Sequence, residues 1–64
     1  MSSREIIRRL VADGWSLRNV RGSHHQFVHL DKPGRVTVKH PSMDVPVGTL
    51  RNIYRQARWS WEDR

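Results

Sequence analysis

The sequence contains no cysteine among its 64 residues, and this absence removes several kinds of protein at once. Disulfide scaffolds, cysteine zinc sites and thiol nucleophiles are excluded, and the composition is compatible with a reducing cytosol. Long apolar runs are also missing, since no segment approaches the roughly 20 residues of a membrane span. The opening segment, MSSREIIRRLVADGW, carries charges throughout and lacks the apolar centre of a signal peptide. We therefore expect a cytoplasmic protein without a membrane anchor.

Acidic residues are scarce as well. Six Asp and Glu oppose twelve Lys and Arg, which gives a formal net charge of +6 at pH 7 and a sequence pI near 11.4. Positive charge at this density attracts polyanions, and nucleic acid is the abundant polyanion of a cytosol. Charge alone leaves an acidic protein partner open as the alternative. A chain of this length has room for one domain, residues 1–64, with a small core.

Two segments repeat apolar residues at helical spacing. The first covers residues 3–13 and carries its apolar residues on one face, namely Ile6, Ile7, Leu10 and Val11. Ser2 and Glu5 have the spacing of a capping box at its start, and Gly14 is placed to end the helix in a left-handed conformation. The second covers about residues 47–58 and has an apolar face made by Leu50, Ile53, Tyr54 and Ala57.

Between the helices the apolar period changes to two, which predicts three strands. They cover, in order, residues 15–20, 25–30 and 35–39. Gly22 and Ser23 mark the first turn, and DKPG, residues 31–34, marks the second. The order α-β-β-β-α predicts an α+β fold, in which two helices cover one face of a three-stranded antiparallel sheet and the other face is partly exposed to water.

Four histidines raise the question of a metal site. His25 and His29 would project from the same strand face, but roughly 13 Å of strand separates them, too far to share one ion held about 2.1 Å from each nitrogen. His24 points to the opposite face. With no cysteine and no cluster of carboxylates in the strand region, we expect neither a metal ion nor another cofactor.

A metal-free reaction is nevertheless open to a protein that binds RNA, because the 2′-hydroxyl of the substrate can act as the nucleophile. Histidine, with an ordinary pKa of about 6.5, can remove that proton or protonate the leaving oxygen, while Arg or Lys stabilises the charge on phosphorus. His24 follows the turn, with Arg21 before it, and the turn residues Gly22 and Ser23 offer backbone amides and a hydroxyl to phosphate. The residues alone leave open whether His24 is a catalyst or a strand cap.

The stretches DGW, VRGSHHQF and KPGRVTVKHPSMDVPVGTLRNIYRQA together resemble the HicA toxins of bacterial and archaeal toxin–antitoxin pairs. The motifs Gly-Ser-His-His, His-Pro at 40–41 and Gly-Thr-Leu-Arg at 48–51 fall in the family's order and spacing. The chain departs from the family pattern at Lys39, where proline is frequent, and at Arg58, where glycine is frequent. The resemblance implies a fold like a double-stranded-RNA-binding domain. It also implies a type II toxin that cleaves mRNA without a metal, blocks translation and is inhibited by the antitoxin HicB.

By this resemblance His24 is the expected catalytic residue. The residues expected to contact RNA are Arg21, Gly22, Ser23, Arg35, Lys39 and His40. A structural role in the loop is an equal alternative for His40. We expect a monomeric free toxin whose partners are RNA and a HicB-type antitoxin. A non-catalytic RNA-binding module, or a protein that binds only an acidic partner, stays open as the alternative.

The remaining prominent side chains are predicted to be structural. Core or edge packing is expected for Trp15, Leu17 and Phe27, and packing in the layer of Phe27 for His25 and His29. Asp13 and Asp44 are expected to be solvated or to cap helices. In the tail WSWEDR, Ser60 can cap a further helical turn, and the two tryptophans either close the core or present an apolar surface to a partner.

Overall fold

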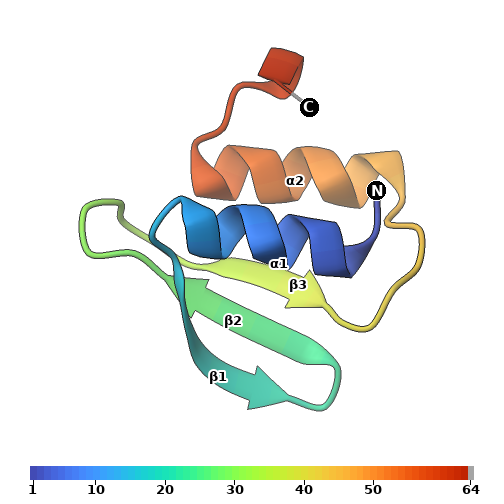
Figure 1. Ribbon diagram of the computed structural model, residues 1–64, viewed down its shortest axis with the longest axis horizontal. Coiled ribbons are helices and arrows are strands. Elements are labelled where there is room, and N and C mark those ends of the chain that lie inside the picture. The colour runs from blue at the N-terminus through green and yellow to red at the C-terminus, as the bar shows by residue number, and fades with distance from the viewer. Residues whose placement is uncertain (64) are drawn as a thin grey trace.

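The computed structural model describes residues 1–63, which form two helices, a three-stranded sheet and a short 3-10 helix (Figure 1). In chain order the elements are α1 (Ser3–Ala12), β1 (Ser16–Arg21), β2 (His24–Val28), β3 (Val36–Lys39), α2 (Val47–Ala57) and η1 (Trp61–Asp63). The predicted order α-β-β-β-α and the α+β class are confirmed. No helix in this part of the chain combines the length and the apolar character that crossing a membrane requires.

Both ends of α1 are fixed by the local contacts that the sequence predicts. The hydroxyl of Ser2 accepts a hydrogen bond from the backbone N–H of Glu5 at 3.2 Å, and the Glu5 carboxylate accepts one from the Ser2 N–H at 3.1 Å. This is the predicted capping box. Gly14 follows the helix with a φ of +98°, and a Cβ atom there would lie 2.8 Å from Nε2 of His29. Glycine is therefore required at this turn for both conformation and space.

The sheet is antiparallel in the order β1-β2-β3, and its register determines which side chains share a face. His24 pairs with Arg21 of β1 and with Lys39 of β3, whereas Phe27 pairs with Val36. Successive side chains of a strand point to opposite faces. Phe27 and Val36 are buried, so the face that carries His24 and Lys39 is the one turned away from the core.

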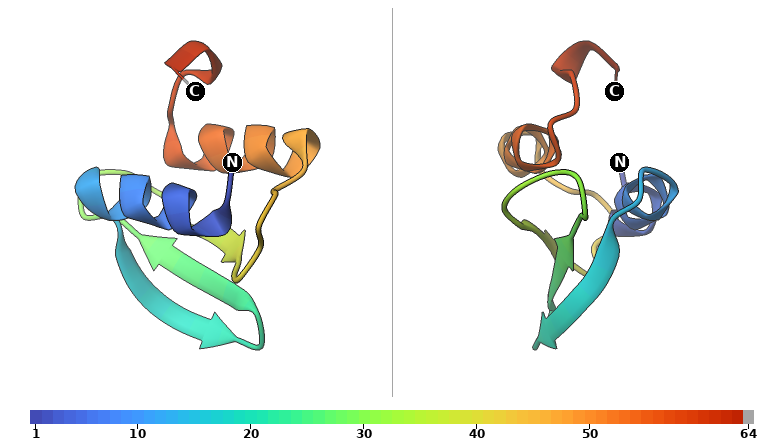
Figure 2. Two further views of the ribbon diagram at one scale, coloured as in Figure 1. Left: turned by 45° about the vertical axis from the view of Figure 1, so that its right-hand side comes forward. Right: turned by 90° about the vertical axis from the view of Figure 1, so that its left-hand side faces the viewer.

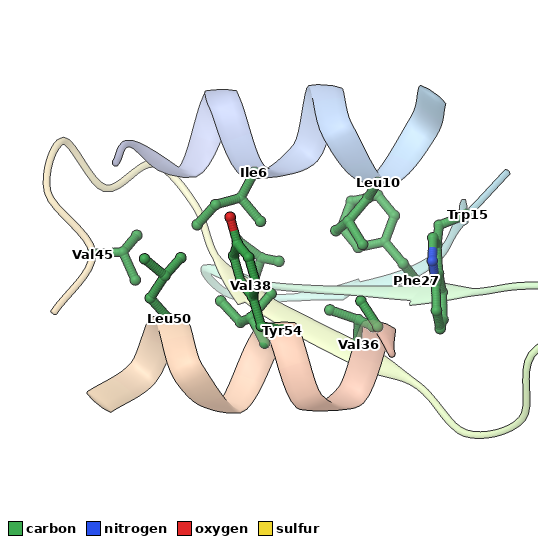
Figure 3. Close-up of a cluster of buried hydrophobic side chains, with 11 residues drawn as sticks. Ile6, Leu10, Trp15, Phe27, Val36, Val38, Val45, Leu50 and Tyr54 are labelled. Atoms are coloured by element: carbon green, nitrogen blue, oxygen red, sulfur yellow. The ribbon is translucent and has the colours of Figure 1, made fainter. Parts of the chain in front are cut away.

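Both helices lie on the same side of the sheet, as predicted (Figure 2). Between the helices and the sheet lies one apolar cluster (Figure 3), made of Ile6, Leu10, Trp15, Phe27, Val36, Val38, Val45, Leu50, Ile53, Tyr54 and Ala57. The helices contact mainly β3, and all six residues of β1 are exposed. Leu17 in β1, predicted to pack in the core or at an edge, is about half exposed at the edge strand. The sheet face opposite the helices is open to solvent.

The second strand ends two residues earlier than predicted, and this changes the environment of His29. β2 ends at Val28 because its last partner is Ser16, the first residue of β1. The ring Nε2 of His29 lies 2.7 Å from the backbone carbonyl oxygen of Asp13, which fixes the ring beside the end of α1. The prediction that His29 shares a strand face with His25 is therefore wrong, because His29 lies beyond the paired part of the strand.

The tail after α2 folds back and closes one side of the core. The rings of Trp59 and Trp61 each meet the ring of Tyr54 edge to face, with 5.2 Å between centroids. The hydroxyl of Ser60 accepts a hydrogen bond from the backbone N–H of Glu62 at 3.3 Å, which confirms the predicted cap of a further helical turn. Of the two roles predicted for the tryptophans, core closure is the one observed.

Asp13 connects three parts of the chain, a role that the sequence prediction missed. Its Oδ2 accepts hydrogen bonds from Nζ of Lys32 at 2.6 Å, from Nε1 of Trp59 at 3.0 Å and from Nε1 of Trp15 at 3.1 Å. These bonds, with that from Lys32 the strongest, lower the pKa of Asp13 to about 2. The carboxylate thus joins the end of α1, the loop before β3 and the tail.

We expect Asp13→Asn to lower the free energy of unfolding by about 1–2 kcal/mol at pH 7, because it removes the charge from these hydrogen bonds while the site is partly screened by water. The folded-state pKa of Asp13 lies below its ordinary value of 3.8, so its contribution is complete above that pH and is lost as the pH falls towards 2. Urea unfolding at several pH values measures this. Asp44→Asn is the matched control, because Asp44 is 93 % exposed and pairs with the N-terminus at 3.6 Å. Equal losses in the two variants would contradict the role of Asp13.

Candidate active site on the open face of the sheet

The turn between β1 and β2 consists of two residues, Gly22 and Ser23. Gly22 has a φ of +56° at the first central position, as in the two-residue turns that match the twist of a hairpin. The carbonyl oxygen of Ser23 accepts a hydrogen bond from the backbone N–H of His40 at 2.8 Å, so the turn is also tied to the end of β3. The turn therefore holds the first residue of β2, His24, in a fixed place at the end of the sheet.

His24 occupies the centre of a row that crosses all three strands. Arg21 is its partner in β1 and Lys39 is its partner in β3, and all three residues are exposed. Directly opposite residues in an antiparallel pair have their Cβ atoms about 4.5–5.5 Å apart. We call Arg21, His24 and Lys39 the His24 row. It places an imidazole between two cationic side chains on the open face.

A further cation lies on the same face, one step along β2. Gln26 is two residues from His24 and therefore shares its face, and its Oε1 accepts a hydrogen bond from the guanidinium of Arg35 at 3.0 Å. None of the six acidic residues lies in a strand. The open face thus combines one histidine with cations at Arg21, Arg35 and Lys39 and carries no opposing charge from the strands.

His40, by contrast, lies on the helix side of the sheet. Its ring meets the ring of His25 edge to face, with 5.1 Å between centroids, and its Nδ1 lies 2.7 Å from the hydroxyl oxygen of Ser3. Ser3 is almost fully buried and also accepts a hydrogen bond from the backbone N–H of Ser42 at 2.8 Å. The Ser3 hydroxyl thus makes hydrogen-bond contacts with two residues of the segment that follows β3.

This position separates His40 from the other residues predicted to contact RNA. The contact with Ser3 joins α1 to the end of β3, which favours the structural alternative for His40; its contact with RNA stays a prediction. The sequence prediction did not include Ser3 as a hydrogen-bond partner of His40, although the sequence contains a signal for its burial. Ser3, Ile6 and Leu10 recur at helical spacing, so a serine stands on the apolar face of α1 and needs a buried hydrogen-bond partner there.

The four histidines do not gather into one site. His24 is on the open face, His25 and His40 meet on the helix side, and His29 lies beside the end of α1. Within residues 1–63 no three His, Cys, Asp or Glu side chains are grouped so that they could hold a metal ion. The chemistry that the open face can offer is therefore that of one imidazole and its neighbouring cations.

Comparison with known proteins identifies the family of the chain. A sequence model described as the HicA toxin of bacterial toxin–antitoxin systems matches residues 3–59, which include every strand and both α-helices. No curated protein matches the chain. The matched region covers most of the 64 residues and contains the whole His24 row. The chain therefore belongs to the HicA toxin family of bacterial toxin–antitoxin systems.

Proposed function

We propose that this toxin is a metal-independent endoribonuclease that cleaves mRNA and so blocks translation, with His24 as its catalytic residue. The observation that carries the proposal is the His24 row, in which an exposed imidazole stands between Arg21 and Lys39 on a face without acidic strand residues. A polyanion approaches such a face readily, and its phosphates come within reach of a group that transfers protons near neutral pH.

The reaction uses the nucleophile that RNA itself carries. The 2′-oxygen loses its proton and forms a bond to the adjacent phosphorus, and the bond from phosphorus to the 5′-oxygen of the next nucleotide breaks. The 5′-oxygen takes up a proton, so the products are a 2′,3′-cyclic phosphate and a 5′-hydroxyl end. His24 serves one of the two proton transfers, and water can serve the other.

The cations beside His24 have a separate role in this proposal. Negative charge increases on the phosphoryl oxygens as the 2′-oxygen attacks, and the charged ends of Arg21 and Lys39 stabilise it. Arg35, one step further along the sheet, is suited to bind a neighbouring phosphate, and the backbone of Gly22 and Ser23 offers amide donors at the turn. These residues hold the scissile phosphate against His24.

A HicB-type antitoxin is the proposed inhibitor. A protein that covers the open face with acidic groups would neutralise the His24 row and exclude RNA at the same time. Purified antitoxin is expected to abolish both RNA binding and cleavage, and the inhibition is expected to weaken as salt rises.

One observation favours a second candidate function, a module that binds RNA without cleaving it. Both cross-strand neighbours of His24 are cations, so neither supplies the second histidine or the carboxylate that would complete an acid–base pair. Such a module would bind RNA in a salt-dependent way and leave it intact after long incubation. Gel analysis of RNA incubated with the purified protein separates the two functions.

We expect cleavage to proceed at an undiminished rate in EDTA. The reason is the arrangement of residues 1–63, which gathers no three side chains able to hold a metal ion. The measurement is the initial rate of RNA cleavage after dialysis against EDTA, with and without added Mg²⁺. Loss of activity in EDTA and its recovery with Mg²⁺ would contradict the proposed mechanism.

A further inference from the structure

A cavity of about 510 Å³ is lined by residues of α2 and of the tail that follows it. This tail lies on the side of the helices away from the sheet (Figures 1 and 2). Its lining comes from one face of α2 and from the folded-back tail, and consists of Gly48, Arg51, Asn52, Tyr54, Arg55, Trp59 and Trp61. The match to the HicA family ends at residue 59, so one wall, Trp61, lies outside the matched region. The cavity is thus separate from the His24 row in space and partly in sequence.

Aromatic rings and guanidinium groups both line this cavity. The ring of Tyr54 meets that of Trp61 edge to face, and the guanidinium carbon of Arg51 lies 5.0 Å from the centre of the Trp61 ring. Arg55 is oriented by a hydrogen bond that its guanidinium donates to the side-chain oxygen of Asn52 at 3.0 Å. The two arginines are therefore held at the cavity by contacts with its other walls.

The charge of the cavity selects an anionic ligand. Two arginines line it, and no Asp or Glu is among the lining residues that the structure describes. Planar aromatic and guanidinium surfaces next to cations suit a ligand that combines a flat ring with a phosphate, and a nucleotide of single-stranded RNA has both. An acidic peptide would satisfy the arginines but would leave the aromatic surfaces without a matching group.

We propose that this cavity is a second RNA subsite, in which Arg51 and Arg55 bind phosphate and a base packs against the indole and guanidinium planes. The inference rests on the proposed ribonuclease function, because it assigns a further part of the same substrate. The subsite lies across the helix layer from His24, so it contacts RNA outside the cleaved bond. Its loss should raise KM for a long RNA and leave kcat unchanged.

Binding of a non-cleavable oligonucleotide tests the subsite without any cleavage. The probe is a 2′-O-methyl oligouridylate of about twelve nucleotides, which lacks the 2′-hydroxyl nucleophile. In the double variant Arg51→Gln/Arg55→Gln we expect the dissociation constant for the probe to rise at least about fivefold. We also expect the slope of the logarithm of the binding constant against the logarithm of the salt concentration to decrease in magnitude by about 0.7 for each phosphate that the variant no longer binds. Arg8→Gln is the control, since Arg8 is exposed on α1 and is not among the lining residues.

The single variant Arg55→Gln separates the loss of a phosphate contact from a displacement of the tail. Arg51 also covers Trp61, whereas Arg55 contacts Asn52 on its own helix, and thermal melting checks the fold of each variant. Ultraviolet crosslinking of the probe to the tryptic peptide that begins at Trp59 would support the subsite. If the Arg51 and Arg55 variants bind the probe with the affinity and salt slope of Arg8→Gln, the subsite is overturned. It is also overturned if these variants bind RNA normally but no longer bind purified antitoxin.

Failure of the subsite proposal can be distinguished from failure of the proposed ribonuclease function. Intact RNA after incubation with the wild-type protein would contradict the nuclease assignment, whereas the probe measures binding alone. If Arg55→Gln cleaves RNA with the KM of the wild-type protein, the subsite is overturned while the nuclease assignment stands.

Discussion

Replacing His24 with alanine is expected to abolish RNA cleavage while leaving the fold intact. The side chain is exposed at the first position of β2, so its loss should change the free energy of unfolding by less than about 0.5 kcal/mol. General acid–base catalysis by one positioned histidine contributes about 10²–10⁴-fold to a rate, and the cleavage rate should fall by that factor. Initial rates on a labelled RNA, measured at equal concentrations of folded protein, give the comparison.

The neighbouring histidine supplies the matched control. His25 is the same residue type one position along the strand, but it faces the helices and meets the ring of His40. We expect His25→Gln to lower thermal stability and to retain cleavage per folded molecule. Wild-type cleavage by His24→Ala, or an equal loss of cleavage in both variants, would remove the assignment of His24.

Replacing Phe27 with alanine is expected to remove much or all of the stability of the fold. Phe27 belongs to the apolar cluster between the helices and the sheet, and only 2 % of its surface is exposed. Truncation of a buried phenylalanine to alanine costs about 3–5 kcal/mol. A domain of this length has a total stability of about 3–10 kcal/mol, so the loss removes much or all of it. Far-UV circular dichroism during thermal melting measures the effect.

Leu30→Ala is the control for this prediction. Leu30 is as apolar as Phe27 but is fully exposed in the loop after β2, so its truncation should change stability by less than about 0.5 kcal/mol. A cooperative melt of Phe27→Ala at the wild-type temperature would show that the core described here does not stabilise the protein.

The fold could be predicted closely because local signals and tertiary packing agree. Ser2 and Glu5 form the capping box that their spacing predicts, and Gly14 takes the positive φ expected of it. The change of period from helical to alternating marked the sheet, and the turn at Gly22 set where β2 begins. Each of these features depends on residues close together in the chain.

The features that were missed depend on partners far apart in the chain. Asp13 receives hydrogen bonds from Lys32 and Trp59, whose approach is decided by packing and not by local pattern. The end of β2 was predicted two residues too late because strand length depends on where the partner strand begins. For His40 the sequence leaves RNA contact and a structural role as equal alternatives, and only the tertiary contact with Ser3, far away in the chain, favours the structural one.

The candidate site was predictable in part for the same reason. The sequence places Arg21 and His24 on either side of a two-residue turn, and such a turn makes them cross-strand neighbours. The addition of Lys39 to the row required the register of β3, which the intervening chain does not specify by itself. The cavity beside α2 required the tail to fold back onto Tyr54, which no local pattern predicts.

The nature of the RNA ends tests most directly the claim that His24 cleaves RNA through the substrate's own 2′-hydroxyl. The purified toxin is incubated in EDTA with an RNA that contains one mapped cleavage site, and with the same RNA carrying a 2′-deoxynucleotide at that site. We predict 5′-hydroxyl and 2′,3′-cyclic phosphate ends from the ordinary RNA, and no cleavage at the deoxynucleotide or by His24→Ala. Equal cleavage of the two RNAs, or products with 5′-phosphate ends, would contradict the mechanism.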